Sequence, residues 1–318
     1  MSLDRRRFLA LAGATAASAA FAYPTGPIRL LVGFPAGGPN DILARPIAAW
    51  LSRRLGQPVV IENRPGSSGN VATAEVVRAP ADGHTLLLVG PANAIGASLG
   101  SELGFVFLRD IAPVAAITRE PLVMVVNPAV PATSVADVIA QARARSQRLR
   151  LASTGEGSAP HLTGELFRTM AGIDLNIVQF PGGAAALAAT IEGKADVMFE
   201  PMSAALAPVK AGTLRALAVT TATHSPALPH VPTVSDTVPG FEASAVTGIG
   251  VPQRTPAEII ERLNREINAA YADPAVTAQL ADTGGSVLAL SPAQFGQLLA
   301  EETQKWGKMV RAARGGAR

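Results

Sequence analysis

The chain has 318 residues, 48% of them hydrophobic and 16% charged, which is enough to build two domains of ordinary size. Its 27 basic and 24 acidic residues nearly balance, and no cluster of Lys and Arg is interleaved with aromatic residues, so nucleic acid is not an expected partner. Cysteine is absent, which excludes disulfides and thiolate metal sites.

The first 22 residues are predicted to be an export signal that is not part of the fold. Three arginines at positions 5–7 precede an apolar run over residues 8–17, and Ala-Phe-Ala at 20–22 fits a small-residue cleavage site. The run is too short to span a bilayer. The arginines resemble a twin-arginine signal, although they also suit the general secretory route. We expect a periplasmic protein, cleaved near Ala22, whose remaining 24 basic and 23 acidic residues give a formal charge of +1.

Short runs rich in Val, Ile and Leu alternate with longer segments of helical periodicity along the rest of the chain. The expected strands are 28–34, 59–62, 85–89, 114–117, 122–126, 149–152, 176–179, 197–199, 214–220 and 247–251. The expected helices are 40–55, 70–78, 135–145, 159–171, 184–192, 202–211, 256–270, 274–282 and 292–313. Strands that alternate with helices favour parallel sheets that are covered by helices on both faces.

The expected strands are too numerous for one small sheet, and two segments are interpreted as crossings between lobes. Residues 121–127 form an apolar run that begins at one proline and ends just before another, and residues 247–252 contain two glycines. Two crossings predict an α/β clamshell of two lobes, each with a parallel-rich sheet, joined by a double-strand hinge around a ligand cleft. The predicted division is lobe 1 at 23–123 plus 248–318 and lobe 2 at 124–247.

A buried strand, a glycine turn and a helix start follow one another over residues 30–41. A helix start presents unpaired N–H groups and the positive end of the helix dipole to its surroundings. Because residues 34–41 include neither Lys nor Arg, an anion bound there would be held mainly by main-chain amides. The candidate ligand-binding residues of this first loop are Phe34, Pro35, Ala36, Gly37, Gly38, Asn40 and Asp41.

Further glycine-containing loops follow other strands at the equivalent position. Ligands of open α/β sheets bind beyond the carboxyl ends of the strands, so several such loops favour a binding cleft over plain turns. Glu200 follows a strand end and is interpreted as facing the space between the lobes. The other candidates are Ser153, Thr154, Gly155, Glu156, Gly157, Ser158, Ala159 and His161 in a second loop, Phe180, Pro181, Gly182 and Gly183 in a third, and Asn93 in a weaker fourth.

Four of these side chains have two interpretations each. Asp41 is either an acidic residue in a first helical turn, favourable by ~0.3–1 kcal/mol, or an acceptor for a ligand hydroxyl or ammonium. Ser158 either caps its helix or donates to a ligand carboxylate, and His161 either anchors the loop or contacts the ligand. Glu156 would weaken an anion site unless it points to solvent or meets a polar ligand group.

Motifs of enzymatic chemistry are missing from the sequence. The four histidines lack metal-binding spacing, so no metal ligand is expected. No nucleophile elbow, phosphate-binding loop or complete dinucleotide motif is present either. We therefore expect neither an enzyme nor a cofactor.

Segments spread over nearly the whole chain resemble one family. They are residues 23–24, 27–29, 34–38, 56–66, 81–87, 157–162, 229–234 and 239–241. Together they resemble the Bug receptors, the TctC-like solute-binding proteins of tripartite tricarboxylate transporters. The resemblance implies a type II-like periplasmic-binding-protein fold that closes on a small organic carboxylate. It also implies that main-chain amides of residues 34–41 and 154–161 hold the ligand, often through bridging waters.

The resemblance implies an integral membrane permease as the partner, and we expect the receptor to be a monomer. A ligand-sensing receptor that feeds a membrane signalling system is the alternative. Phe180, Val246 and Glu156 depart from the residues usual in the family. These departures lead to the hypothesis that the far end of the cleft is less polar and suits a monocarboxylate or a ligand with an apolar body.

Overall fold

The computed structural model describes residues 23–99, 103–144, 148–281 and 283–315. The predicted export signal at residues 1–22 lies outside the described residues. The strands are β1 Ile28–Val32, β2 Val59–Asn63, β3 Thr85–Val89, β4 Ile111–Val126, β5 Arg150–Ser153, β6 Asn176–Gln179, β7 Val197–Pro201, β8 Arg215–Val219, β9 Ser244–Pro252 and β10 Ser286–Val287. The helices are α1 Pro39–Leu55, α2 Asn70–Arg78, α3 Pro91–Leu99, α4 Phe107–Asp110, α5 Val135–Arg143, α6 Ala159–Ala171, α7 Gly183–Ile191, α8 Met202–Lys210, α9 Ala257–Ala270, α10 Pro274–Ala281 and α11 Pro292–Gly315.

The structure corrects the sequence prediction at β4. The separate strands expected at 114–117 and 122–126 are wrong, because β4 runs without interruption from Ile111 to Val126. Pro121 marks the start of the expected crossing between lobes, and in the structure it pairs with Ser244 of β9 inside the sheet. Three elements were not expected at all, namely α3, α4 and β10.

Strand β4 joins two groups of strands into one hydrogen-bonded path. The order is β2-β1-β3-β9-β4-β7-β5-β6, and both β8 and β10 also pair with β4. The pairs β1–β2, β1–β3, β5–β6 and β5–β7 are parallel. The pairs that β4 makes with β9 and β7 are antiparallel. The predicted parallel-rich sheets are therefore two halves of one mixed sheet, each with its parallel strands away from β4.

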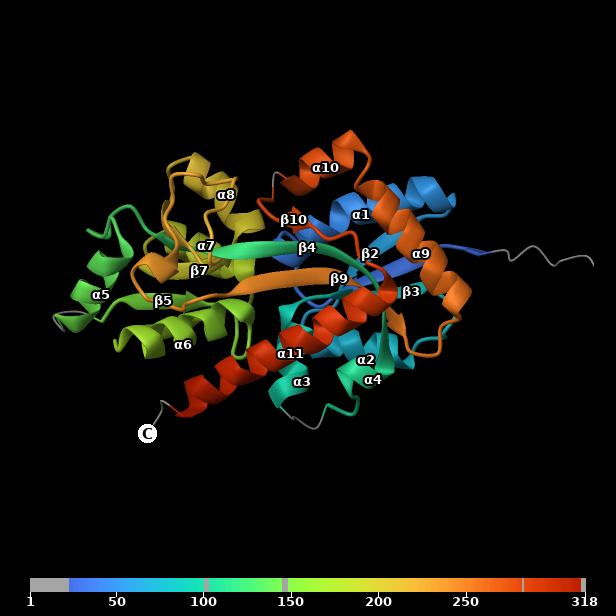
Figure 1. Cartoon of the computed structure of the whole chain (residues 1–318), viewed down its shortest axis with the longest axis horizontal. Helices are drawn as coiled ribbons and strands as arrows, with labels where there is room; N and C mark the ends of the chain where they lie inside the picture. Colours follow the sequence, from blue (N-terminus) through green and yellow to red (C-terminus); the bar gives the residue numbers. More distant parts are fainter. Residues whose placement is uncertain (1–22, 100–102, 145–147, 282, 316–318) are drawn as a thin grey trace, which may run out of the picture.

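The two strands that run through the middle of the molecule are β4 and β9 (Figure 1). Up to Pro121, β4 pairs with β9, and from Leu122 onward it pairs with β7 and β8. Just before β9 begins, the N–H of Ala243 donates to the carbonyl of Thr220 at 2.9 Å. In Figure 1, α5 to α8 lie toward one end of this pair of strands, at the left, and α1, α2 and α9 lie toward the other end.

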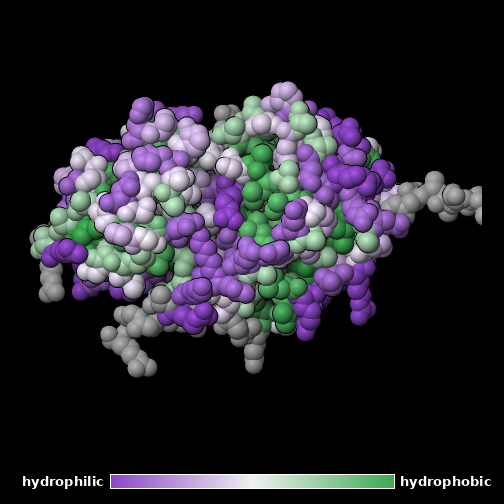
Figure 2. Space-filling model, in the orientation of Figure 1, coloured by the Kyte–Doolittle hydropathy of each residue, from purple (hydrophilic) through white to green (hydrophobic). Residues whose placement is uncertain are grey.

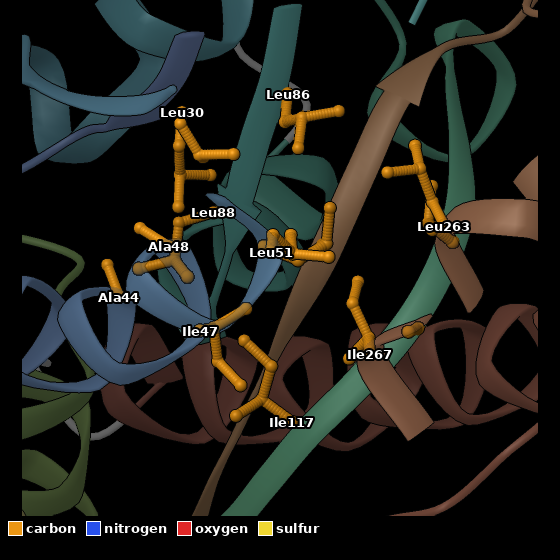
Figure 3. Close-up of a cluster of buried hydrophobic side chains, with 14 of the residues drawn as sticks. Leu30, Ala44, Ile47, Ala48, Leu51, Leu86, Leu88, Ile117, Leu263 and Ile267 are labelled. Atoms are coloured by element: carbon orange, nitrogen blue, oxygen red, sulfur yellow. The ribbon is translucent and has the colours of Figure 1, made fainter. Parts of the chain in front are cut away.

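Each half of the sheet has its own hydrophobic core. In the first, the spacing of Ala44, Ile47, Ala48 and Leu51 forms an apolar stripe on α1 that packs near β1, β3 and α9 (Figure 3). Burial of each large side chain of this kind contributes roughly 1.5–3 kcal/mol. The second core centres on three phenylalanine rings with centroids 5.5–6.1 Å apart. Separate cores in the two halves of one continuous sheet allow each half to be rigid by itself.

Helix α11 contacts both halves. It crosses obliquely past β9 and α3 in Figure 1 and packs against α3 and α6. Trp306 of α11 is 1% exposed and belongs to one apolar cluster with Ile95 of α3 and Leu162 of α6. This helix is therefore a third connection between the halves, besides β4 and β9.

The face of the molecule drawn in Figure 2 is largely hydrophilic, with an apolar area near its centre where Figure 1 shows β4 and β10. Within the described residues, no helix has both the length and the apolar character needed to cross a bilayer.

Candidate functional site

A cavity of about 660 Å³, counting the open space at its mouth, lies at the carboxyl ends of strands from both halves of the sheet. Among the described residues that line it there is no Lys, Arg or His, and Glu120 and Glu200 are the ionisable ones. The wall is made of Phe34, Pro35, Gly38, Pro39, Asn40, Pro91, Ala92, Glu120, Thr154, Ser158, Ala159, Pro160, Gly183, Ala184, Glu200, Pro201, Ala245 and Thr247.

Four helices begin on the wall of this cavity. The first residues of α1, α3, α6 and α7 all line it, two helices from each half of the sheet. The residues that precede α1 and α7 are Gly38 and Gly182, and neither offers a side chain to cap the helix. Main-chain N–H groups and the positive ends of the helix dipoles are thus left for an anion.

Asp41 holds the first loop in shape rather than facing the cavity. Its residue is 1% exposed, and its Oδ2 accepts hydrogen bonds from the N–H of Gly37 at 3.0 Å and from Arg45 at 2.7 Å. Oδ1 accepts from Asn63 at 3.3 Å. Burial alone would raise the pKa of Asp41, but the hydrogen bonds from Gly37, Arg45 and Asn63 outweigh it and the pKa is lowered. The carboxylate is therefore ionised and committed to its own loop.

Ser158 and His161 organise the second loop. Ser158 Oγ accepts from the N–H of His161 at 3.3 Å, which caps α6, and also from Thr154 Oγ1 at 2.9 Å. The Nδ1 of His161 accepts from the N–H of Gly157 at 3.1 Å. Burial lowers the pKa of His161 despite the nearby carboxylates, so the ring is neutral at pH 7 and suited to accept. Ser158 and Thr154 line the cavity, whereas His161 stands behind the loop.

The third loop closes against the first. A Cβ on Gly183 would lie 3.0 Å from Cδ of Pro39, and one on Gly182 would lie 3.3 Å from Pro35. Gly182 also has φ +130°, a conformation that disfavours other residues. Glycine at both positions lets the starts of α1 and α7 approach each other across the cavity.

A hydrogen bond also joins the second loop to the segment that precedes α2. Ser68 Oγ donates to the main-chain carbonyl of Glu156 at 3.0 Å. Ser67 and Ser68 have φ of 45° and 51°, which places both in the left-handed region that residues other than glycine adopt at a cost. The side chain of Glu156 itself is exposed to solvent.

Two buried glutamates lie on the wall. Glu120 Oε2 accepts a hydrogen bond of 3.0 Å from the N–H of Ser203, in the first turn of α8. Burial raises the pKa of Glu120 to about 7, and burial together with the charge of Glu120 raises the pKa of Glu200 well above its usual value. Among the described residues, neither oxygen of Glu200 has a hydrogen-bond partner.

The structure sorts the predicted site residues into three groups. Those on the cavity wall are Phe34, Pro35, Gly38, Asn40, Thr154, Ser158, Ala159, Gly183 and Glu200. Those that line an adjoining hollow, shared with Phe34, Pro35 and Thr154, are Gly155, Phe180, Pro181 and Gly182. Those that line neither are Ala36, Gly37, Asp41, Asn93, Ser153, Glu156, Gly157 and His161. Asn93 instead accepts from the N–H of Gly90 and donates to Thr73.

The predicted site residues make up half of the wall, and some of the other wall residues lie inside the predicted loops. Several missed residues are helix starts beside residues that were predicted, so the same signal would have found them. Glu120 gave no signal, because it lies in the interior of a strand. Pro39, Pro160, Pro91 and Ala92 lie within the predicted first, second and fourth loops. The wall residues outside every predicted loop are Glu120, Ala184, Pro201, Ala245 and Thr247.

Known proteins share both the sequence pattern and the fold. The family model described as the tripartite tricarboxylate transporter family receptor matches residues 43–314. BugT of Bordetella pertussis is 36% identical over 96% of this chain and 94% of its own length. Rpa4515 of R. palustris, solved with adipate, has a TM-score of 0.88 at 36% identity and covers 92% of this chain and 98% of its own. MatC of Rhodopseudomonas palustris, solved with bound malate, has a TM-score of 0.86 at 30% identity and covers 91% of this chain and 100% of its own.

Proposed function

Because the chain belongs to the receptor family of the tripartite tricarboxylate transporters, we propose that it binds a small organic carboxylate between its two lobes through main-chain amides. The family consists of periplasmic solute receptors rather than enzymes. The observation that carries the proposal is the meeting of four helix N-termini at a cavity without a cationic side chain among the described lining residues. Such N-termini bind carboxylates with charge-assisted hydrogen bonds worth about 1.5–3 kcal/mol each.

The ligands of two relatives support a carboxylate. Rpa4515 was solved with adipate and MatC with malate, and both structures superpose on nearly the whole of this chain. Both of those compounds are small organic acids. The predicted lobes, 23–123 plus 248–318 and 124–247, would close on such a ligand by bending at β4 and β9, where β4 exchanges one set of partner strands for another.

We further propose where the receptor is located, in which oligomeric state it acts and what it docks on. The chain is exported, cleaved near Ala22, and acts as a monomer in the periplasm. The closed, loaded receptor docks on the permease subunits of a tripartite transporter and releases the carboxylate there.

Removal of one main-chain donor tests the binding mode. Ala159 is the first residue of α6 and lies on the cavity wall, and Ser158 before it is in the extended conformation that proline accepts. Ala159→Pro therefore deletes an N–H while leaving a residue that suits a helix start. We expect calorimetry with a panel of carboxylates to show about tenfold or greater loss of affinity.

The matched control is Ala257→Pro, at the exposed first residue of α9, after Pro256 in an extended conformation. It should keep affinity within about twofold of the unmodified protein, since it alters the same kind of position far from the cavity. Unchanged affinity of the folded Ala159→Pro protein would contradict binding through the second loop. A panel in which no carboxylate binds would contradict the proposed function.

A further inference from the structure

The two glutamates on the cavity wall are unexpected in a site that binds anions. Glu120 comes from the interior of β4 and Glu200 from β7, and the residues are 1% and 0% exposed. Glu120 has one partner, the N–H of Ser203. Glu200 has no partner for either oxygen within the part of the chain that the structure describes. Because a buried carboxyl group without a partner costs stability, these oxygens point to a group that arrives with the ligand.

The cavity has one positive and one negative region. The starts of α1, α3, α6 and α7 direct N–H groups and helix dipoles toward it. The start of α8 also reaches the wall at Pro201, but there Glu120 already accepts from an N–H of the first turn. Two neighbouring carboxyl groups that are both buried do not readily ionise together, so near neutral pH the empty pair keeps at least one proton and carries at most one negative charge.

Resting on the proposed binding of a carboxylate, we infer that Glu120 and Glu200 bind a protonated amino group at another position of the same ligand. The receptor is then specific for an amino carboxylate and not for a dicarboxylate. The ligand carboxylate binds at the helix N-termini, and its ammonium group donates to the free oxygens of Glu200 and to Glu120.

An ammonium group fits the pair better than other ligand groups do. It carries three donors and one positive charge, which matches both the unpartnered oxygens and the charge of the pair. A hydroxyl has one donor and no charge. A second carboxylate would meet the charge of the glutamates in a cavity with little water, where repulsion between like charges is strong.

Ligands of matched length test this assignment. The mature protein is titrated by calorimetry with 6-aminohexanoate, hexanoate and adipate, and with the shorter set 4-aminobutyrate, butyrate and succinate. Within the length that binds best, we expect the amino carboxylate to bind about tenfold or more tightly than the plain monocarboxylate and the dicarboxylate.

Near-isosteric variants then assign the preference to the two side chains. Glu200→Gln and Glu120→Gln should each weaken binding of the amino carboxylate about tenfold and reduce its advantage over the monocarboxylate. Glu261→Gln, at an exposed glutamate of α9, is the matched control and should change neither. Thermal unfolding verifies that each variant is folded.

The outcomes separate the inference from the function on which it rests. Binding of plain carboxylates with no gain from the amino group, tighter binding of adipate or succinate, or an unchanged preference in folded Glu200→Gln would each overturn the inference alone. If none of the six compounds and no other carboxylate binds, the proposed function is overturned.

Discussion

Polar side chains next to the cavity mostly shape the loops and do not face the ligand. Asp41 and His161 had two interpretations each in the sequence, and in the structure both bind main-chain N–H groups of their own loops. Their hydrogen bonds fix where the starts of α1 and α6 point. A change at either residue would therefore alter binding through the position of main-chain donors.

The buried glutamates should make the empty protein less stable as the pH rises. Folding raises the pKa of Glu120 from 4.5 to about 7 and raises the pKa of Glu200 well above its usual value. Between pH 5 and 7 the unfolded chain has lost these protons while the folded protein retains them, so the free energy of unfolding falls with increasing pH. Glu120→Gln and Glu200→Gln should flatten this decline in thermal unfolding between about pH 5 and 7.5.

Comparison with each variant isolates the contribution of the glutamates. The pKa of His161 is lowered, so its protonation favours the unfolded chain as the pH falls, and this effect is common to all the proteins. The Asp41 carboxyl, with its lowered pKa, titrates below this window. An equal pH dependence of stability in the unmodified protein and in both variants would contradict the raised pKa values.

Residues whose role is local could be predicted from the sequence, whereas those whose role depends on distant neighbours could not. Gly38, Ser158 and Gly183 are helix starts, and their sequence context alone indicated exposed N–H groups. Glu120 carries no such context, because its burial arises from strands that meet it from elsewhere in the chain. Asp41 is a similar case. One of its hydrogen-bond partners, Asn63, lies on strand β2, which is distant in sequence.

At the scale of elements, the short helical turn Ser67–Gly69 connects the two sides of the cavity. Its Ser68 hydroxyl bonds the carbonyl of Glu156 in the second loop, although the two are far apart in sequence. Two consecutive serines in the left-handed region store backbone strain, which the rest of the structure must offset. The segment therefore helps to hold the second loop in the position that the structure shows.

Loss of this hydroxyl should shorten the life of the closed complex. Ser68→Ala removes one hydrogen bond, worth about 0.5–1.5 kcal/mol net, so we expect ligand dissociation to accelerate about twofold to tenfold in stopped-flow measurements. Ser67→Ala is the control, since Ser67 has the same backbone conformation and an exposed side chain. Equal dissociation rates for the two variants would show that the bond between Ser68 and Glu156 does not hold the complex closed.

The type of an element could be predicted where its periodicity is visible in the local sequence. The ends of an element could not be predicted where pairing with a distant strand determines them. Helix α1 was predicted to within one residue at its start because its apolar stripe repeats with helical spacing. Strand β4 was divided in error, since its polar middle is a strand only because β9 pairs with it. Helix α3 was overlooked because Pro91 indicates a turn as readily as a first helical residue.

At the scale of the whole molecule, β4, β9 and α11 are among the elements that link the two halves. β4 and β9 are extended and can bend, whereas α11 packs on α3 and α6, both of which begin at the cavity. Any opening of the lobes must therefore change the packing around Trp306. Closure of the lobes on a ligand would restore this packing.

Trp306 should report this motion in solution. We expect ligand binding to shift tryptophan emission toward shorter wavelength as the indole becomes buried between α3 and α6. Trp50→Phe should keep the shift, because Trp50 lies within one core and donates to Glu266 of α9. Trp306→Phe should abolish it. A shift that survives Trp306→Phe and disappears in Trp50→Phe would contradict the proposed role of α11.

Because the N–H groups of helix starts donate to the bound anion, such a receptor can diverge in a particular way. No single side chain encodes the carboxylate site, so amino-acid replacement rarely deletes it, and the path of the backbone preserves it. Replacements at the few polar side chains of the wall, such as Glu120, Glu200 and Thr247, alter instead what else the ligand must carry. A lineage built on this plan can therefore exchange one organic acid for another in few steps, while its common recognition of carboxylates is inherited with the fold.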